Sequence, residues 1–320
     1  AQDIHKGFNE IWTNPARLIS VTGDTNISEN ANKKIRSYYT TIKDTKIDKP
    51  DTVRSVVFPY LKLPMTKTIV RAKKTYPYID VTRFTFDNGL VFNFKKTDFE
   101  PNMVRIAAHF GPGEQGESVS GMALVADDIV NLSGTKSLSL SELETIVAAS
   151  SVDLSFRIGR SSSSWSGSAL TSDMGLLIQL LRSLLLDPGF EKTAYKKVLQ
   201  RFEMMHSRLE KDIDGAVLYK VQPFWAGGNP HYGLPARKDM QRLKYDKVLA
   251  WVTELLDLND LEISIVGDVN VEDILPLLSE SFGSLTLDES PKRRLDEIVE
   301  FPTGETLNLN VDSSIEKSRI

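Results

Sequence analysis

Residues 262–268 read Glu-Ile-Ser-Ile-Val-Gly-Asp, and residues 18–24 read Leu-Ile-Ser-Val-Thr-Gly-Asp at a shift of 244 positions. In both copies the β-branched residues indicate a short strand, and Gly-Asp indicates the turn that follows it. Upstream, in residues 4–12 and 248–256, apolar residues recur at the 3.6-residue spacing of an amphipathic helix. The shared Ser, Gly-Asp and following Asn favour a tandem repeat over a chance match of two common helix–strand–helix units.

The repeat sets the domain organisation that we expect, because one complete module lies between its two copies. Residues 1–45 are then the C-terminal tail of a preceding homologous module, and residues 46–81 are a linker. Residues 82–289 form the complete module, and residues 290–320 are a linker and the first strand of a following module. On this interpretation the chain is a piece of a longer protein.

The composition indicates a globular chain and excludes several classes of protein. Its 320 residues are 41% hydrophobic and 26% charged, which allows a large core and argues against disorder or a long coiled coil. Apolar stretches fall short of the roughly 20 residues of a membrane span, so none is expected. The net charge is −4. Residues 1–80 hold 14 basic and 8 acidic side chains, which favours a solvated basic segment over a nucleic-acid site.

The chain contains no cysteine, which excludes disulfides, thiolate nucleophiles and Cys-ligated zinc. A cysteine-free chain fits both the bacterial periplasm and the cytoplasm. The compartment therefore stays open between the two, with the periplasm favoured.

The pattern of strands and helices predicts an α+β fold, with a mainly antiparallel sheet backed by helices. Asn88-Gly89 interrupts an alternating stretch and predicts a hairpin with a type I′ turn. Strands are expected at residues 81–94 (as this hairpin), 103–110, 152–158, 162–170 and 261–266. A helix is expected to begin at Ser120 or Gly121 and to end near Leu132, and further helices are expected at residues 139–149, 172–187, 195–209, 241–256 and 271–282. The strands cluster early and return once after the long helices, which does not fit an alternating parallel fold.

The sequence offers few groups for catalysis. No two of its four histidines lie within five residues of each other, which excludes a local zinc pair. The serines at residues 161–164 lack a surrounding Gly-x-Ser-x-Gly and are typical of an exposed strand. Asp127 and Asp128 are adjacent on a predicted helix, so they point in different directions and make a poor acid–base pair.

Several short motifs nevertheless follow one another in a distinctive order. They are Asn88-Gly89-Leu90, Gly113-Glu114, residues 121–129, Gly134-Thr135, Asp187-Pro188-Gly189-Phe190, residues 231–235 (His-Tyr-Gly-Leu-Pro) and Ile265-Val266-Gly267-Asp268. No single motif is specific, but their order and spacing resemble a module of the insulinase-type (pitrilysin-type, inverzincin) zinc metallopeptidases. The resemblance implies that family's fold for residues 82–289.

The resemblance also implies that this module has lost its zinc. Active modules carry Gly-x-Ala-His-x-x-Glu-His, which supplies two zinc ligands and the general base, and a further glutamate about 75 residues later completes the site. Here Leu124 and Asp128 stand at the two histidine positions, and Asp127 stands at the glutamate position. Residues 192–202, where the distal glutamate is expected, contain no acid. We therefore expect no catalytic residue, metal ligand or cofactor in this chain.

Families of this type pair an active half with a degenerate half that encloses a substrate chamber. The chain is accordingly predicted to belong to the non-catalytic half of a zinc metalloendopeptidase, inactive alone, with zinc in the active half of the same parent chain. Its partners would be that active half and a peptide substrate. A structural scaffold with no peptidase role, as in core subunits of respiratory complexes, remains the alternative. An independent enzyme with other chemistry has no supporting motif.

Strand addition at an exposed sheet edge is the expected way of holding peptide. The strand beginning Ser161, Ser162, Ser163, Ser164 and Trp165 looks polar on both faces, and we expect it to be an edge near the substrate chamber. A merely solvated edge strand stays open as the other interpretation.

Overall fold

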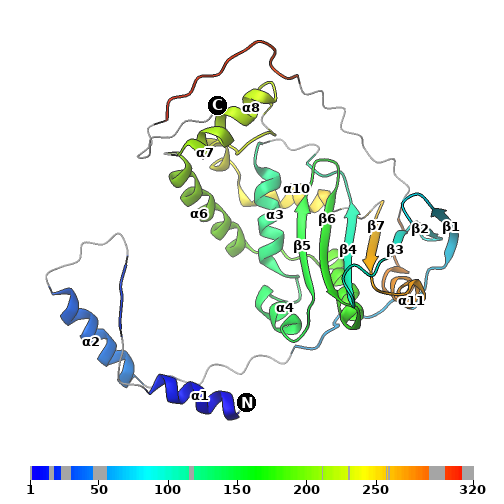
Figure 1. The fold of residues 1–320 in the computed structure, drawn as a ribbon, viewed down its shortest axis with the longest axis horizontal. Coiled ribbons are helices and arrows are strands. Elements are labelled where there is room, and N and C mark those ends of the chain that lie inside the picture. Colours follow the sequence, from blue (N-terminus) through cyan, green and yellow to red (C-terminus); the bar gives the residue numbers. More distant parts are fainter. Residues whose placement is uncertain are drawn as a thin grey trace. The chain divides into compact units, whose positions relative to one another are not determined.

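The chain divides into two compact units, residues 1–55 and 56–320, and each is described by itself. In the first unit, the described residues form two helices, α1 (Gln2–Trp12) and α2 (Ala31–Asp44) (Figure 1). The computed structural model describes residues 2–13, 18–22, 30–45, 56–114, 119–210, 212–229, 231–256, 258, 260–287 and 300–311.

A seven-stranded sheet lies at the centre of the second unit, in the order β1-β2-β3-β7-β4-β6-β5 (Figure 1). Its strands are β1 (Val70–Tyr76), β2 (Val81–Phe86), β3 (Val91–Lys96), β4 (Met103–Phe110), β5 (Asp153–Ile158), β6 (Ser163–Leu170) and β7 (Glu262–Gly267). Among these strands β3 and β7 pair in parallel, and every other neighbouring pair is antiparallel. The prediction of a mainly antiparallel sheet is confirmed.

The helices of the second unit pack against this sheet or against one another. They are α3 (Met122–Ser133), α4 (Leu140–Val147), α5 (Met174–Leu186), α6 (Lys192–Leu209), α7 (Ile213–Ala216), α8 (Gln222–Trp225), α9 (Arg237–Met240), α10 (Tyr245–Leu255) and α11 (Val271–Phe282). A 3₁₀ turn (Thr171–Asp173) precedes α5, and a π-helical turn, η2 (Val217–Val221), joins α7 to α8. The short elements α7, η2, α8 and α9 were not predicted.

The long helices follow the predicted apolar spacing. In α5, Leu177 and Leu181 are fully buried, and the helix contacts β6 and α11. Each such leucine contributes roughly 1.5–3 kcal/mol by leaving water. The helix ends before Pro188, whose ring cannot accept the helical geometry. At the start of α4, Ser139 and Glu142 form a reciprocal capping box.

The predicted first hairpin is present as β2 and β3, but its turn differs from the expected one. Gly89 alone has a positive φ, of 91°, and the Phe86 N–H donates to the Leu90 carbonyl, which leaves a three-residue turn instead of a type I′ turn. The Asn88 side chain explains the difference, because its amide donates to the carbonyls of Phe282 and Leu285 and so ties the turn to the end of α11.

Residues 46–81, which we expected to be linker, include β1. This strand pairs with β2 and presents an exposed edge at one end of the sheet. Before it, the carbonyls of Leu61 and Lys62 accept hydrogen bonds from Arg182 of α5. The pattern missed β1 because its side chains are almost all exposed and it contributes nothing to the buried face. The assignment of residues 82–289 as one complete module stays a prediction.

The predicted repeat is matched by helices on both sides of the shared stretch. At a shift of 244, α1 falls on α10 within one residue, and α2 overlaps α11. The stretch between them differs, because residues 262–267 form β7 whereas residues 18–22 are not in a strand. A strand needs a hydrogen-bonded neighbour, and none is described for residues 18–22. The tandem repeat therefore stays a prediction.

Candidate functional site

The candidate site lies on α3, at the positions where the resemblance places the zinc-binding motif. Leu124, Asp127, Asp128 and Asn131 are spaced at i, i+3, i+4 and i+7, so they form one stripe along the helix. Gly121, with a φ of 90°, precedes the helix. The other face of α3 is buried in the core. This stripe is thus left to contact neighbouring elements and solvent.

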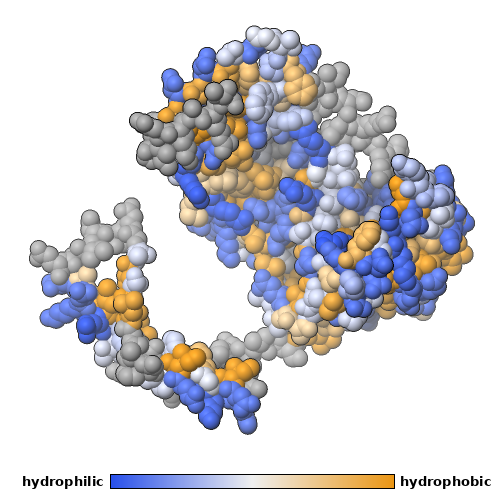
Figure 2. All heavy atoms as spheres, viewed as in Figure 1, coloured by the Kyte–Doolittle hydropathy of each residue, from blue (hydrophilic) through white to orange (hydrophobic). Residues whose placement is uncertain are grey.

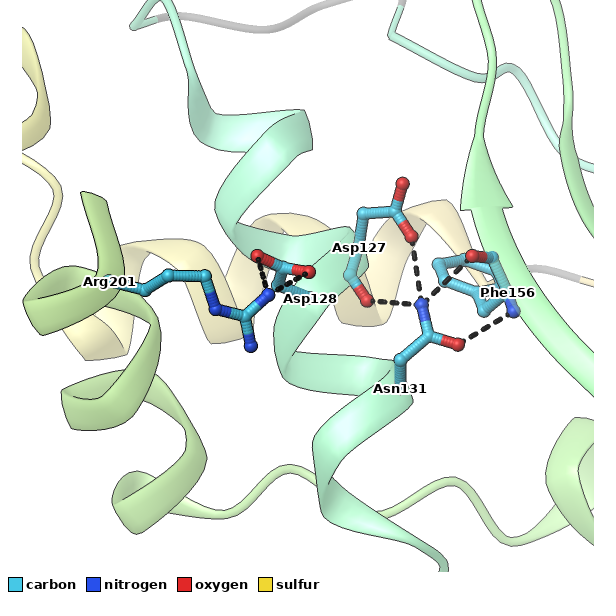
Figure 3. A network of polar contacts seen from close by, with 5 residues as sticks. All are labelled: Asp127, Asp128, Asn131, Phe156 and Arg201. Carbon is cyan, nitrogen blue, oxygen red and sulfur yellow. Dashed lines mark hydrogen bonds and ion pairs between the residues drawn. The ribbon is translucent and has the colours of Figure 1, made fainter. Parts of the chain in front are cut away.

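Asp128 points from α3 toward α6, where it meets Arg201 (Figure 3). The guanidinium Nη1 lies 3.3 Å from each carboxylate oxygen. Both side chains are partly exposed, so the pair stabilises the fold by no more than about 1 kcal/mol. The positive charge of Arg201 nevertheless lies beside the Asp128 carboxylate and compensates its negative charge.

Asp127 points the other way, toward β5, as expected for adjacent residues on a helix (Figure 3). Its Oδ1 accepts a hydrogen bond of 3.0 Å from the Asn131 amide. Burial, together with the neighbouring charge of Asp128, raises the pKa of Asp127 to about 6. Hydrogen bonds from Ile158 and Asn131 and the charge of Arg157 oppose this increase but do not cancel it.

Asn131 connects this stripe to the edge of the sheet. Its Nδ2 donates to the Phe156 carbonyl at 2.9 Å, and its Oδ1 accepts from the Phe156 N–H at 2.8 Å (Figure 3). β5 is the last strand in the sheet order, so these two groups lie on its outer edge. The amide of Asn131 therefore takes the place of one residue of a neighbouring strand. An added peptide strand could pair with β5 there only after displacing this side chain.

The serine-rich strand is not where we expected it. β6 lies between β4 and β5 and pairs with both over its length, so the prediction of an edge strand is wrong. Ser163 is fully buried, and Trp165, only 3% exposed, packs on Phe156 with ring centroids 5.3 Å apart. Serine is small enough to fit an inner strand, which is why the polar composition was misleading. Whether Ser161, Ser162 and Ser164, which are exposed or half-buried, contact substrate stays a prediction.

The sequence of this strand does contain the alternation of core-facing residues that is typical of an inner strand. Trp165 and Ala169 both point to the core, with the small residue Gly167 between them. Asn131 could have been found from its i+7 spacing to Leu124. Arg201 carries no such local signal, because only the packing of α6 on α3 brings it to Asp128.

The residues on this stripe do not fit a zinc ion. Leu124 has no lone pair to donate, and its side chain is about one-third exposed. Asp128 is paired with Arg201, whose positive charge would repel a cation at that place. Among the described residues, no group of three or more His, Asp or Glu side chains could hold a metal. With the ligand set replaced in this way, no metal-assisted step can be derived for this module.

Comparisons with known proteins agree with this architecture. The chain is similar to a variant of the ferredoxin protease FusC solved with Arabidopsis ferredoxin (16% identity, TM-score 0.61), covering 92% of this chain and 33% of that one. It is also similar to a peptidase M16 inactive domain from Pseudomonas fluorescens (14% identity, TM-score 0.55), covering 70% and 54% respectively.

The chain has the fold of the M16 peptidases. The periplasmic protease PqqL from Escherichia coli gives the same result, with 20% identity and a TM-score of 0.60 over 83% of this chain. The chain spans about a third of the length of FusC and 29% of PqqL. No family model and no curated protein sequence matches it. Within the described residues, no helix has the length and apolar character to cross a bilayer.

Proposed function

We propose that this chain belongs to the non-catalytic half of a zinc-dependent metalloendopeptidase. The observation that carries the proposal is the combination of an M16 peptidase fold with a stripe on α3 that cannot bind zinc. Leu124 and Asp128 stand where histidines would be needed, and Arg201 neutralises Asp128. Zinc and the general base would be supplied by an active half of the same parent chain.

The proposed role is to enclose and position a peptide substrate. Peptide hydrolysis needs the substrate held in place and bulk water excluded, and a second concave module can do both without catalytic groups. Pairing with β5 is disfavoured, because Asn131 already satisfies Phe156 at that edge. The substrate would instead be held by the active half and confined by side chains of this one.

The exposed face of α1 supports the proposal that residues 1–45 are the tail of a preceding module. On α10, the matched residues Val248, Val252 and Leu255 are buried against the core. On α1, Ile4 and Phe8 are 78% and 56% exposed, and Figure 2 shows apolar surface over this helix. An apolar stripe of this kind normally faces a hydrophobic core.

The proposal is tested with the parent protein. Deleting the segment that corresponds to residues 1–320 should lower peptide hydrolysis at least about 100-fold, the scale expected when substrate positioning is lost. Adding the purified chain back in trans should restore part of the activity. Full activity of the remaining part without this chain would contradict the proposal.

The scaffold alternative rests on the same absence of ligands on α3. The two functions predict different neighbouring sequences. A peptidase requires His-x-x-Glu-His in the parent reading frame upstream of residue 1 or in a neighbouring gene. Finding that motif favours the peptidase half. Its absence from both places favours a structural role.

A further inference from the structure

A cavity of about 540 Å³ lies beside Ser120, at the start of α3, and does not include the stripe of that helix. It is open to solvent on one side and is lined by the end of α6, by α7 and η2, by the loop that leads into α9, and by the extended residues 309–311. A volume of this size is typical of a small-ligand site. Its lining includes Leu209, Tyr219, Pro223, Tyr232, Leu234 and Pro235, and is therefore aromatic and apolar over much of its surface.

The side chain of His206 in α6 is part of this lining, and one of its ring nitrogens has an unsatisfied hydrogen-bonding capacity. The side chain is 2% exposed and stacks on Tyr219 of η2, with ring centroids 5.1 Å apart. Its Nδ1 is hydrogen-bonded to the Tyr219 hydroxyl. Its Nε2 is buried and has no hydrogen-bond partner among the described residues. A buried polar atom without a hydrogen-bond partner destabilises the folded state, so it calls for an explanation.

The hydrogen bond at Nδ1 determines whether Nε2 is a hydrogen-bond donor or an acceptor. Burial lowers the pKa of His206 and raises that of Tyr219, so both groups are neutral near pH 7. A neutral imidazole carries one proton. If the Tyr219 hydroxyl donates to Nδ1, then Nε2 carries that proton and only one donor remains unsatisfied. The opposite arrangement would leave both the hydroxyl proton and the Nε2 lone pair without partners.

The charges around the cavity argue against an anion as the partner of this N–H. Arg237 lies on the lining, but its guanidinium is 3.3 Å from Glu203 and 3.4 Å from Glu210 and also donates to Ser207. These two carboxylates neutralise it. Lys220 and Asp239, also on the lining, add one charge of each sign, so the lining offers no clear excess of positive charge. A neutral acceptor such as an amide carbonyl is therefore better suited than a carboxylate or phosphate.

We propose that this cavity binds a neutral amide carrying an aromatic or branched apolar group, with its carbonyl accepting a hydrogen bond from His206 Nε2. The apolar group would lie against the tyrosines and prolines of the lining. Such a group has the chemistry of an uncharged stretch of peptide. The site does not depend on the peptidase role proposed above, because none of its lining residues belongs to the stripe on α3.

The test uses the full 320-residue chain, labelled with ¹⁵N, and the probe N-acetyl-L-phenylalaninamide. A ligand of this size should bind with a Kd on the order of 1 mM. The His206 ring signals, assigned with a His206→Asn variant, should move saturably, while those of His5, His109 and His231 stay in place. No movement of the His206 signals at about tenfold higher probe concentration would show that water alone satisfies Nε2, and would overturn the proposal.

Two comparisons test the chemistry. N-acetyl-L-phenylalanine, which carries a carboxylate in place of the C-terminal carboxamide, should bind at least about threefold more weakly, and tighter binding by the acid would refute the argument from charge. A His206→Leu variant should bind the probe about two- to tenfold more weakly. An unchanged affinity would show that His206 donates no hydrogen bond to the ligand. Ala216→Phe, which fills the cavity from α7, should abolish binding and serves as the matched control.

Discussion

Replacing Asp127 by Asn should make the protein more stable at pH 7 but not at pH 4. The folded protein raises the pKa of this carboxyl from 3.8 to about 6, mainly by burial. A group with a raised pKa binds its proton more tightly in the folded state, so stability falls as pH rises between about 4 and 6 and stays lower above that range. The amide of asparagine has the same shape and no charge, and therefore avoids this loss.

The magnitude follows from the size of the pKa change. About two pKa units correspond to about 3 kcal/mol at 1.36 kcal/mol per unit. The side chain is only partly buried, and solvent screening reduces this to about 1–2 kcal/mol. At pH 4 the folded state is almost fully protonated and the unfolded state roughly 40% protonated, so the difference between wild type and variant should be only about 0.5 kcal/mol.

Urea unfolding followed by circular dichroism, at pH 4 and pH 7, measures this difference. Asp128→Asn is the matched control on the same helix turn. It loses the exposed pair with Arg201 and should be neutral or destabilised by no more than about 1 kcal/mol at pH 7. If Asp127→Asn were less stable than wild type at pH 7, or if its effect were equal at both pH values, the conclusion that the charged Asp127 carboxylate destabilises the folded state would be refuted.

Four further outcomes are expected. Metal analysis after dialysis should find less than about 0.1 zinc per chain, and one tightly held zinc would contradict the ligand argument. The double change Leu124→His plus Asp128→His should give no peptidase activity, because the general base and the distal ligand are still missing; robust turnover would show the motif alignment to be wrong. Asn131→Ala should cost about 1–3 kcal/mol and speed amide exchange at Phe156, since it leaves that backbone unpaired. Trp165→Ala should cost about 3–5 kcal/mol if β6 is an inner strand, whereas a cost below about 1 kcal/mol would indicate an exposed one.

Local sequence pattern was sufficient for most of the strands and long helices. The hairpin at Asn88-Gly89 and the helix that ends before Pro188 depend on turn residues and apolar spacing, which act over a few residues. β1 was missed because an edge strand with exposed side chains has no apolar alternation to detect.

The candidate site was predictable only in part, because its contacts are not local. The spacing of Leu124, Asp127 and Asp128 predicts a stripe on one helix that lacks zinc ligands, and the structure has that stripe. The position of β6 was predicted wrongly because serine content says nothing about which strand lies beyond it. Arg201 is 73 residues from Asp128 in the chain, and only the packing of α6 against α3 brings them together.

The stripe on α3 still joins the elements that a zinc ion would join. In an active module, ligands on one helix and a distal glutamate on a later one would share the metal, and here Asp128 and Arg201 link α3 to α6 directly. On the other side, Asn131 links α3 to the edge of β5. The link to α6 would be lost if the histidines were restored, because an imidazole in place of the Asp128 carboxylate would face the Arg201 guanidinium without a charge to pair with it. Restoring the two histidines would therefore remove one of these links without supplying the general base or the distal ligand, so it should give neither zinc binding nor catalysis.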